Sequence, residues 1–287
     1  KSSSPLLILG SDVWAGSAEN EALEFVESIQ IPVITNGTAR GIIPRGNPLL
    51  VTKARSFAFR SADLILVVGT PLDFRLGYGD FGSAKVIHVS DSPTGIATHA
   101  TLAASTSGDL PAIFTALTNS LSHRVSNEWR ESITQAALKS ASKERELLEA
   151  DLSPIHPARI YGELLPKLAD DAVIIGDGGD FVSFAGKFVE PVRPGCWLDP
   201  GPFGCLGGGM GGIIAARLAR PSAQVVALFG DGALGFSLGD IDSLVRHHLP
   251  AVMVVGNNSA WGLEKHPMQS IFGYDVAADL APQTRYD

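Results

Sequence analysis

Short, continuous apolar runs recur along this chain, and stretches with helical spacing separate them. In the first part of the sequence the runs are Leu6 to Leu9, Pro32 to Thr35, Leu64 to Val68 and Val86 to Val89, with helical patterns from Glu19 to Gln30 and from Asp109 to Ser122. Unbroken apolar strands are typical of parallel sheets that crossover helices cover on both faces. This pattern predicts a doubly wound α/β domain over residues 1–125.

A second α/β pattern begins after a long charged segment. Residues 126–153 predict a linking helix, because Trp129 and Ile133 recur at helical spacing in a charged stretch without Gly or Pro. Three strand-like runs follow, at AVIIG, Val225 to Phe229 and Ala251 to Val255. The sequence GDIDSLVRHHL between the last two predicts their crossover helix. Residues 154–287 are therefore expected to form a second doubly wound domain.

The composition excludes several classes of function. Of the 287 residues 45% are hydrophobic, yet no apolar run reaches the roughly 20 residues that a membrane span needs. The net charge of −8 opposes binding to nucleic acids and to anionic membrane surfaces. The two cysteines, Cys196 and Cys205, lack metal-ligand spacing and are expected to be buried free thiols in a cytoplasmic protein. His247 and His248, on the predicted crossover helix, are expected to have surface or packing roles.

Glycine-rich turns in the second domain follow strands or open helices. They are GDGGDF from Gly176, GPFGCLGGGMGG from Gly201 and GDGALGFS from Gly230. Ligands of doubly wound sheets bind outside the carboxyl ends of the strands, where helix N-termini favour anions. We therefore expect a phosphate-bearing ligand at this edge. The alternative is that each glycine only permits a tight turn.

One carboxylate and one amide side chain end neighbouring strands of this domain. Asp231 follows the strand that ends in Phe229, and Asn258 follows the strand that ends in Val255. Parallel strands bring both ends to one edge, so the two side chains can offer oxygens to Mg²⁺, which prefers oxygen ligands and shares its shell with phosphates. Alternatively, Asp231 caps a helix and Asn258 only forms a turn.

The GDG and NN turns at this spacing resemble the thiamine diphosphate signature of the decarboxylase and acetolactate synthase superfamily. The resemblance implies a central domain followed by a pyrophosphate-binding domain. It also implies that the pyrimidine-binding domain, with its activating glutamate, precedes Lys1 and that the pyrophosphate-binding domain is incomplete beyond Asp287. The segments GPFGCLGGGMG and WGLEKHPM are most similar to acetolactate-synthase-like proteins close to 2-hydroxyacyl-CoA lyases.

The resemblance also implies roles for individual residues. Asp231, Asn258 and the carbonyl of Ala260 would bind Mg²⁺; the carbonyl of Gly204 would receive the aminopyrimidine; and Leu206, where many relatives have Met, would force the bent cofactor conformation. The cofactor-binding set it implies is Gly178, Gly179, Asp180, Gly204, Leu206, Gly230, Asp231, Gly232, Ala233, Asn258, Ala260, Trp261 and Gly262. The candidates for a catalytic role are Leu206, Trp261, Glu264 and His266.

A second cofactor is suggested for the central domain. Arg75 lies in DFRLG, which resembles a segment that contacts FAD in acetolactate synthases and ADP in oxalyl-CoA decarboxylases. The resemblance implies that this domain binds one of these nucleotides or nothing.

Three functions stay open on the sequence alone. The first is a thiamine diphosphate- and Mg²⁺-dependent synthesis of 2-acetolactate and CO₂ from two pyruvates, as in branched-chain amino acid biosynthesis. The second is cleavage of a 2-hydroxyacyl-CoA to an aldehyde and formyl-CoA. The segment after the NN pair lacks the GMVxQW-like run of authentic acetolactate synthases, and this weakens the first function. The third is a non-catalytic nucleotide-binding scaffold. For an enzyme we expect a homodimer or homotetramer, and we expect residues 1–287 alone to be inactive.

Overall fold

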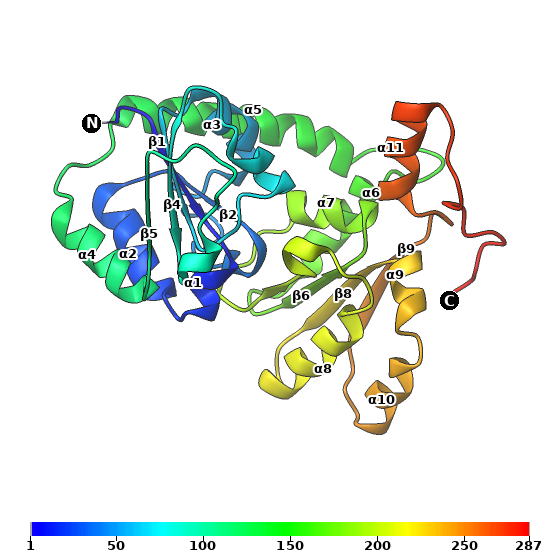
Figure 1. Ribbon diagram of the computed structural model, residues 1–287. Coiled ribbons are helices and arrows are strands. Elements are labelled where there is room, and N and C mark those ends of the chain that lie inside the picture. Colours follow the sequence, from blue (N-terminus) through cyan, green and yellow to red (C-terminus); the bar gives the residue numbers. More distant parts are fainter. Residues whose placement is uncertain (1, 287) are drawn as a thin grey trace. The chain divides into compact units, whose positions relative to one another are not determined.

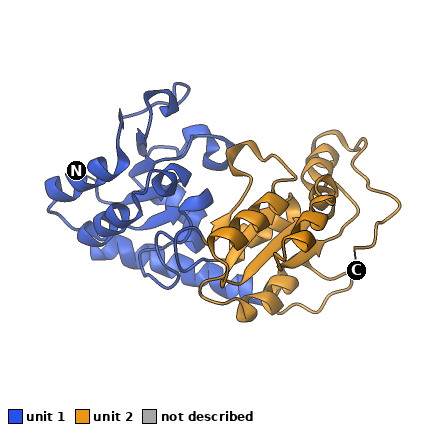
Figure 2. Cartoon of the chain, turned by 90° about the horizontal axis from the view of Figure 1, so that it is seen from below, with its two compact units in different colours: residues 1–146, 190–195 blue, residues 147–189, 196–287 orange. Residues whose placement is uncertain are grey.

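The computed structural model describes residues 2–286 and divides the chain into two compact units. Unit 1 comprises Lys1–Glu146 and Glu190–Gly195, and unit 2 comprises Leu147–Val189 and Cys196–Asp287 (Figure 2). Each unit contains its own parallel β-sheet, as the apolar runs predict. The two α/β domains expected from the sequence are thus confirmed.

Unit 1 is built on a five-stranded sheet in the order β2-β1-β3-β4-β5 (Figure 1). Its strands are β1 (Pro5–Leu9), β2 (Val33–Thr35), β3 (Leu64–Val68), β4 (Lys85–Ser90) and β5 (Ala104–Ser107), and its helices are α1 (Ser11–Ala15), α2 (Glu19–Ile29), α3 (Arg55–Ser61), α4 (Leu110–Ser120) and α5 (Asn127–Leu148). Both faces of β1 are buried: Leu7 packs with Phe25 of α2 and Phe114 of α4, while Leu6 packs in a separate core with Trp129 of α5. The continuous apolar run of β1 is explained by this double burial.

Unit 2 has a four-stranded parallel sheet in the order β7-β6-β8-β9. Its strands are β6 (Val173–Asp177), β7 (Trp197–Leu198), β8 (Val225–Gly230) and β9 (Val252–Gly256), and its helices are α6 (Pro157–Leu164), α7 (Asp180–Phe188), α8 (Gly209–Ala219), α9 (Asp231–Phe236), α10 (Asp240–Arg246) and α11 (Gly262–Phe272). Tyr161 of α6 packs on one face of β6 through Ile174, and Ile213 of α8 packs on the other through Ile175. Short 3-10 turns complete the two units at Gly37–Ala39, Thr52–Ala54, Phe74–Gly79, Pro93–Gly95, Leu165–Lys167 and Gly201–Phe203.

Two short strands have no counterpart in the sequence prediction. Strand β5 has the sequence ASTS and is largely exposed at the edge of its sheet, so it lacks an apolar signal. Strand β7 has only two residues. Helix α5 was expected as a linker, but most of it belongs to unit 1, where Trp129 donates a hydrogen bond to the carbonyl of Pro5 (2.9 Å).

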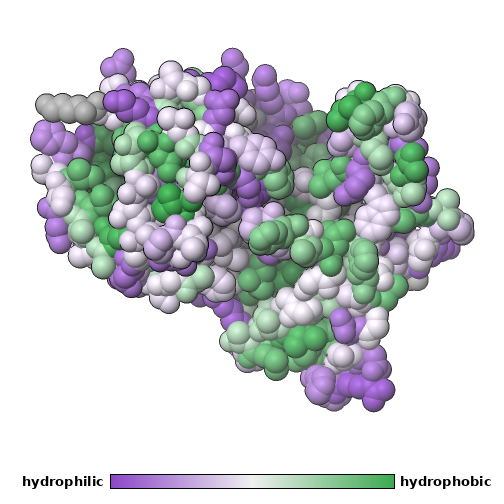
Figure 3. Space-filling view, in the orientation of Figure 1, coloured by the Kyte–Doolittle hydropathy of each residue, from purple (hydrophilic) through white to green (hydrophobic). Residues whose placement is uncertain are grey.

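Apolar side chains remain exposed on some helices of unit 2. Leu218 of α8 and Ile271 and Phe272 of α11 are exposed, and Figure 3 shows hydrophobic residues over these two helices. Exposed apolar groups of this kind are typical of surfaces that contact another molecule. No helix within residues 2–286 combines the length and the apolar character that crossing a membrane requires.

Candidate functional site

A cavity of about 650 Å³ lies in unit 2, where the turns that follow β6, β8 and β9 meet. These turns meet because the three strands are parallel neighbours, with Asp177 paired to Phe229 and Gly230 paired to Gly256 at their carboxyl ends. Every candidate site residue of unit 2 lines this cavity: Gly178, Gly179, Asp180, Gly204, Leu206, Gly230, Asp231, Gly232, Ala233, Asn258, Ala260, Trp261, Gly262, Glu264 and His266.

Asp231 is the first residue of α9, and its side chain is buried, with 5% exposure. Burial raises the pKa of this carboxyl, and hydrogen bonds from the backbone N–H groups of Gly232, Asn258 and Ser259 act in the opposite direction. Because Asn258 and Ser259 belong to the turn after β9, the carboxylate connects two of the turns that form the cavity. It lies where a cation would relieve the cost of its burial.

Asn258 is exposed, and its side-chain oxygen accepts a hydrogen bond from the N–H of Ala260 (3.1 Å). An amide oxygen has two lone pairs, so this bond leaves it able to bind a metal ion. The neighbouring Asn257 has a structural role instead: its side chain accepts from Ser259 N–H (3.3 Å) and donates to the carbonyl of Thr284 (2.7 Å). One carboxylate, one amide oxygen and nearby carbonyls form a donor set that suits Mg²⁺.

The glycines of the cavity permit close approach of its turns. A Cβ atom on Gly178, whose φ is +146°, would lie 2.7 Å from the backbone nitrogen of Gly230. A Cβ atom on Gly232 would lie 2.6 Å from the ring of Trp261, so this ring covers the turn that carries Asp231. Backbone N–H groups at closely packed turns and helix N-termini are suited to a diphosphate. The residues that line the cavity therefore fit both a Mg²⁺ ion and a diphosphate group.

His266 of α11 and Asp180 of α7 are paired across the cavity wall, with 3.1 Å between Nε2 and a carboxylate oxygen. Glu264 is exposed. Lys265, the neighbour of His266 in the sequence, forms an ion pair with Asp279 that raises the pKa of Lys265. It is not among the residues that line the cavity.

Two features of the site have no counterpart in the sequence prediction. One is an apolar part of the cavity wall, formed by Ile155, Pro157, Ile160 and Phe184. The other is Asp177, the last residue of β6, which is buried and whose pKa burial raises. Its position directly after the run AVIIG is the one sequence signal that could have indicated it.

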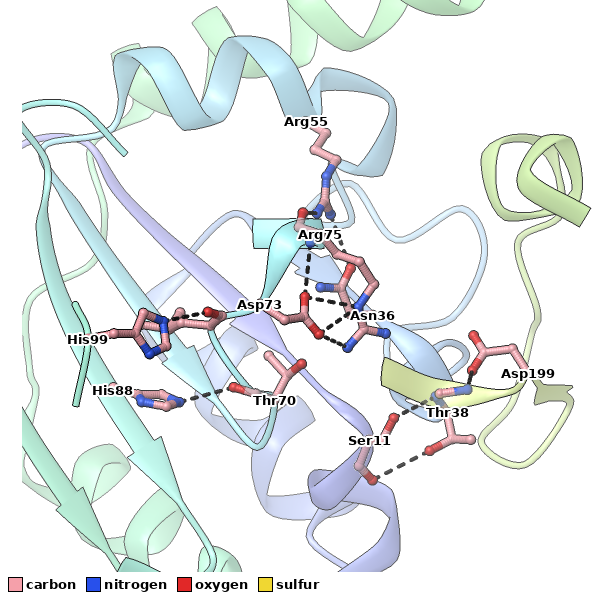
Figure 4. A network of polar contacts seen from close by, with 12 residues as sticks. Ser11, Asn36, Thr38, Arg55, Thr70, Asp73, Arg75, His88, His99 and Asp199 are labelled. Carbon is pink, nitrogen blue, oxygen red and sulfur yellow. Dashed lines mark hydrogen bonds and ion pairs between the residues drawn. The ribbon is translucent and has the colours of Figure 1, made fainter. Parts of the chain in front are cut away.

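Arg75 of the predicted nucleotide segment in unit 1 lies beside Arg55 (Figure 4). Arg75 forms an ion pair with Asp73, in which Nη2 lies 2.7 Å from a carboxylate oxygen. Arg55 donates to the side-chain oxygen of Asn36 (3.1 Å) and to the carbonyl of Arg75 (2.7 Å). Burial, together with the charges of Arg40 and Arg75, lowers the pKa of Arg55 to about 10. Arg55 and Arg75, with the charge of Arg40 nearby, are suited to an anion, but Arg55 and Arg75 already bind Asn36, Asp73 and a backbone carbonyl of the chain itself.

The cysteines and the paired histidines lie outside the cavity lining. Cys196 is buried, as expected, and the prediction that Cys205 is buried is wrong, because it belongs to the exposed glycine loop. His247 and His248 are exposed and follow the end of α10 instead of lying on it. Their surface role is thus confirmed.

Two parallel α/β units, one with a cavity suited to a metal diphosphate, define a cofactor-dependent class of proteins, and sequence comparisons identify it. Residues 1–117 match the family described as thiamine pyrophosphate enzyme, central domain, and residues 177–285 match its C-terminal TPP binding domain. The chain belongs to the thiamine pyrophosphate enzyme family.

The curated relatives of the chain include acetolactate synthases and 2-hydroxyacyl-CoA lyases. Over 287 aligned residues the chain is 47% identical to a probable acetolactate synthase of Mycobacterium bovis and to the acetolactate synthase large subunit IlvG of Mycobacterium tuberculosis, covering 99% of this chain and 52% of each relative. It is 34% identical over 289 residues to human 2-hydroxyacyl-CoA lyase 2, covering 96% of this chain and 45% of that protein. The chain spans about half the length of the curated relatives it matches.

Proposed function

We propose that the protein is a thiamine diphosphate- and Mg²⁺-dependent enzyme that forms or breaks a carbon–carbon bond next to a carbonyl group, and that it is acetolactate synthase-like. The observation that carries this proposal is the meeting of Asp231 and Asn258 in one glycine-lined cavity, at the place where a diphosphate fits. The 47% identity to acetolactate synthases supports the choice of reaction.

Particular residues would hold the cofactor. Asp231, Asn258 and the carbonyl of Ala260 would bind Mg²⁺, and the backbone around Gly178 and Gly232 would surround the diphosphate. The bound cofactor supplies an electron sink for a carbanion next to a carbonyl. Leu206, which lines the cavity, would contact the cofactor, and Trp261 would exclude water from the metal by covering Gly232.

The second candidate reaction, cleavage of a 2-hydroxyacyl-CoA to an aldehyde and formyl-CoA, has its own support. The apolar wall formed by Ile155, Pro157, Ile160 and Phe184 suits an aliphatic chain better than the methyl group of pyruvate. Pyruvate would need a positive side chain for its carboxylate. Lys265 is paired with Asp279 and does not line the cavity, and His266 is paired with Asp180.

Further parts of the proposal concern the oligomeric state, a second cofactor and the cellular location. Exposed apolar residues on α8 and α11 support assembly into a homodimer or homotetramer. The group of Arg40, Arg55 and Arg75 supports an FAD or ADP phosphate in unit 1. The free thiols support a reducing location such as the cytoplasm.

Product analysis tests the proposal on the complete protein that contains this chain. The protein is incubated with thiamine diphosphate, Mg²⁺ and either pyruvate or a 2-hydroxyacyl-CoA, and acetolactate and aldehyde are assayed. We expect acetolactate from pyruvate; aldehyde alone would replace this proposal with the lyase. Neither product, from protein shown to bind the cofactor, would support the non-catalytic scaffold.

A further inference from the structure

We propose that Asp177 is the positioning residue of the glycine loop 201–208, an inference that rests on the proposed cofactor site. Asp177 ends β6 in the interior of unit 2, with 1% exposure. Gly204 and Leu206 of the loop line the cavity, whereas Asp177 is not among the lining residues. Its effect on a ligand would therefore pass through the loop.

Backbone N–H groups of the loop and of the first turn of α8 donate hydrogen bonds to the Asp177 carboxylate. Gly207 N–H donates to both of its oxygens (3.2 and 3.0 Å), and Gly209 N–H donates to one of them (2.7 Å). Within residues 2–286 no ion pair with a lysine, arginine or histidine is found for it. A buried carboxylate without a cation is costly, and these charge-assisted bonds at the N-terminus of a helix offset that cost.

The space around the contact fixes its geometry. A Cβ atom on Gly209 would lie 2.8 Å from Cβ of Asp177 and 2.4 Å from the ring of Phe229, so the helix start is pressed against both. Gly207 has a φ of +93° and turns the chain directly before this contact. The carboxylate therefore determines where the loop ends and α8 begins.

The rest of the loop has few restraints. Phe203 is 91% exposed, Gly204 and Cys205 are exposed, and a Cβ atom on Gly204 would meet nothing within 4 Å. At the other end of the loop, Asp199 accepts a hydrogen bond from Gly201 N–H (2.9 Å). The positions of Gly204 and Leu206 thus depend on two carboxylate anchors, of which Asp177 is the buried one.

Two probes separate positioning from general stability. Thiamine diphosphate would contact both the loop and the diphosphate turns, whereas inorganic diphosphate with Mg²⁺ would contact only the latter. Both are titrated calorimetrically into the complete wild-type protein, Asp177→Asn and the control Arg217→Ala. Arg217 donates to the carbonyls of Ala223 (2.7 Å) and Pro221 (2.7 Å) at the far end of the same helix.

We expect Asp177→Asn to weaken thiamine diphosphate binding on the order of 10–100-fold, the size of loss seen when residues that orient metal ligands are removed. Affinity for inorganic diphosphate should stay unchanged, and the control should bind both probes as the wild type does. Unchanged thiamine diphosphate affinity in Asp177→Asn, or equal losses for both probes, would overturn the inference. A wild-type protein that binds no thiamine diphosphate would instead overturn the proposed function.

A second measurement needs no cofactor. Cys205 is the exposed thiol of the loop and Cys196 is buried, so a nitroxide label will attach to Cys205. We expect its electron paramagnetic resonance spectrum to show faster motion in Asp177→Asn than in the wild type or Arg217→Ala. Equal motion in all three would overturn the inference. If Asp177→Asn does not fold, Asp177→Thr, which keeps one acceptor oxygen, takes its place in both experiments.

Discussion

Each unit has a parallel sheet covered by helices on both faces. The two sheets differ in the groups that bind the charged side chains at the carboxyl ends of their strands. In unit 1 Asp73 pairs with Arg75, and Arg55 donates to the Asn36 side chain and to a backbone carbonyl. In unit 2, Asp177 and Asp231 are buried and are met by backbone N–H groups. The difference teaches that the sheet supplies the place for a site and the turns supply its chemistry.

Glycines at the strand ends offer the largest test of this comparison. In Gly178→Ala the new Cβ would meet Gly230 N at 2.7 Å, and in Gly10→Ala it would meet the carbonyl oxygen of Gly69 at 2.3 Å. Both variants should lose about 1–3 kcal/mol of unfolding free energy through overpacking, measured by urea denaturation. Gly178→Ala alone should also bind thiamine diphosphate about 10²-fold more weakly, because a shift of about 1 Å in a binding group can have an effect of that size.

Gly10→Ala is the matched control because it crowds the corresponding edge of unit 1. If both variants lost the same affinity for thiamine diphosphate, the cofactor would depend equally on both edges. The contrast drawn between the units would then be wrong.

A smaller effect is expected at Leu206, which is half-buried beside the cavity. Leu206→Ala should lower kcat by about tenfold if, as proposed, Leu206 holds the cofactor in its reactive conformation. Its cost in stability should stay below the roughly 2–5 kcal/mol typical of fully buried leucines. Steady-state kinetics and thermal unfolding measure the two effects, with the volume-conserving Leu206→Met as the control. Turnover of Leu206→Ala at the wild-type rate would make Leu206 an ordinary packing residue.

The smallest effect concerns pH and lies in unit 1. Hydrogen bonds from Ser2, Ser3 and Ser4 lower the pKa of Asp63 to about 2, although some burial acts in the opposite direction. Because the folded pKa lies below the ordinary aspartate value of 3.8, the ionised form favours folding. This contribution is complete above about pH 4 and is lost as the pH falls towards about 2.

Urea midpoints measured between pH 5 and pH 2.5 should therefore fall less steeply in Asp63→Asn than in the wild type. Asp63 is largely exposed to solvent, so the difference should be small. A steeper fall in the variant would contradict the assigned direction.

The sequence predicts those features whose cause is local. Leu6 to Leu9 predicts β1 because consecutive leucines and an isoleucine are buried on both faces, and the turns with Asp231 and Asn258 predict the cavity because each follows a strand. Strand β5 escapes prediction because its ASTS sequence is exposed at an edge. Non-local contacts are also hidden: the role of Asp177 depends on Gly207, 30 residues later, and becomes visible only when the loop has folded onto β6.

The central claim is that unit 2 binds thiamine diphosphate through a metal held at Asp231, and calorimetric titration tests it most directly. Thiamine diphosphate is titrated with Mg²⁺ into the complete protein and into Asp231→Ala and Asp73→Ala, which remove one carboxylate from each unit. The wild type and Asp73→Ala should bind alike, and Asp231→Ala should show no Mg²⁺-dependent binding while its circular dichroism spectrum stays unchanged. Wild-type affinity in Asp231→Ala would contradict the account.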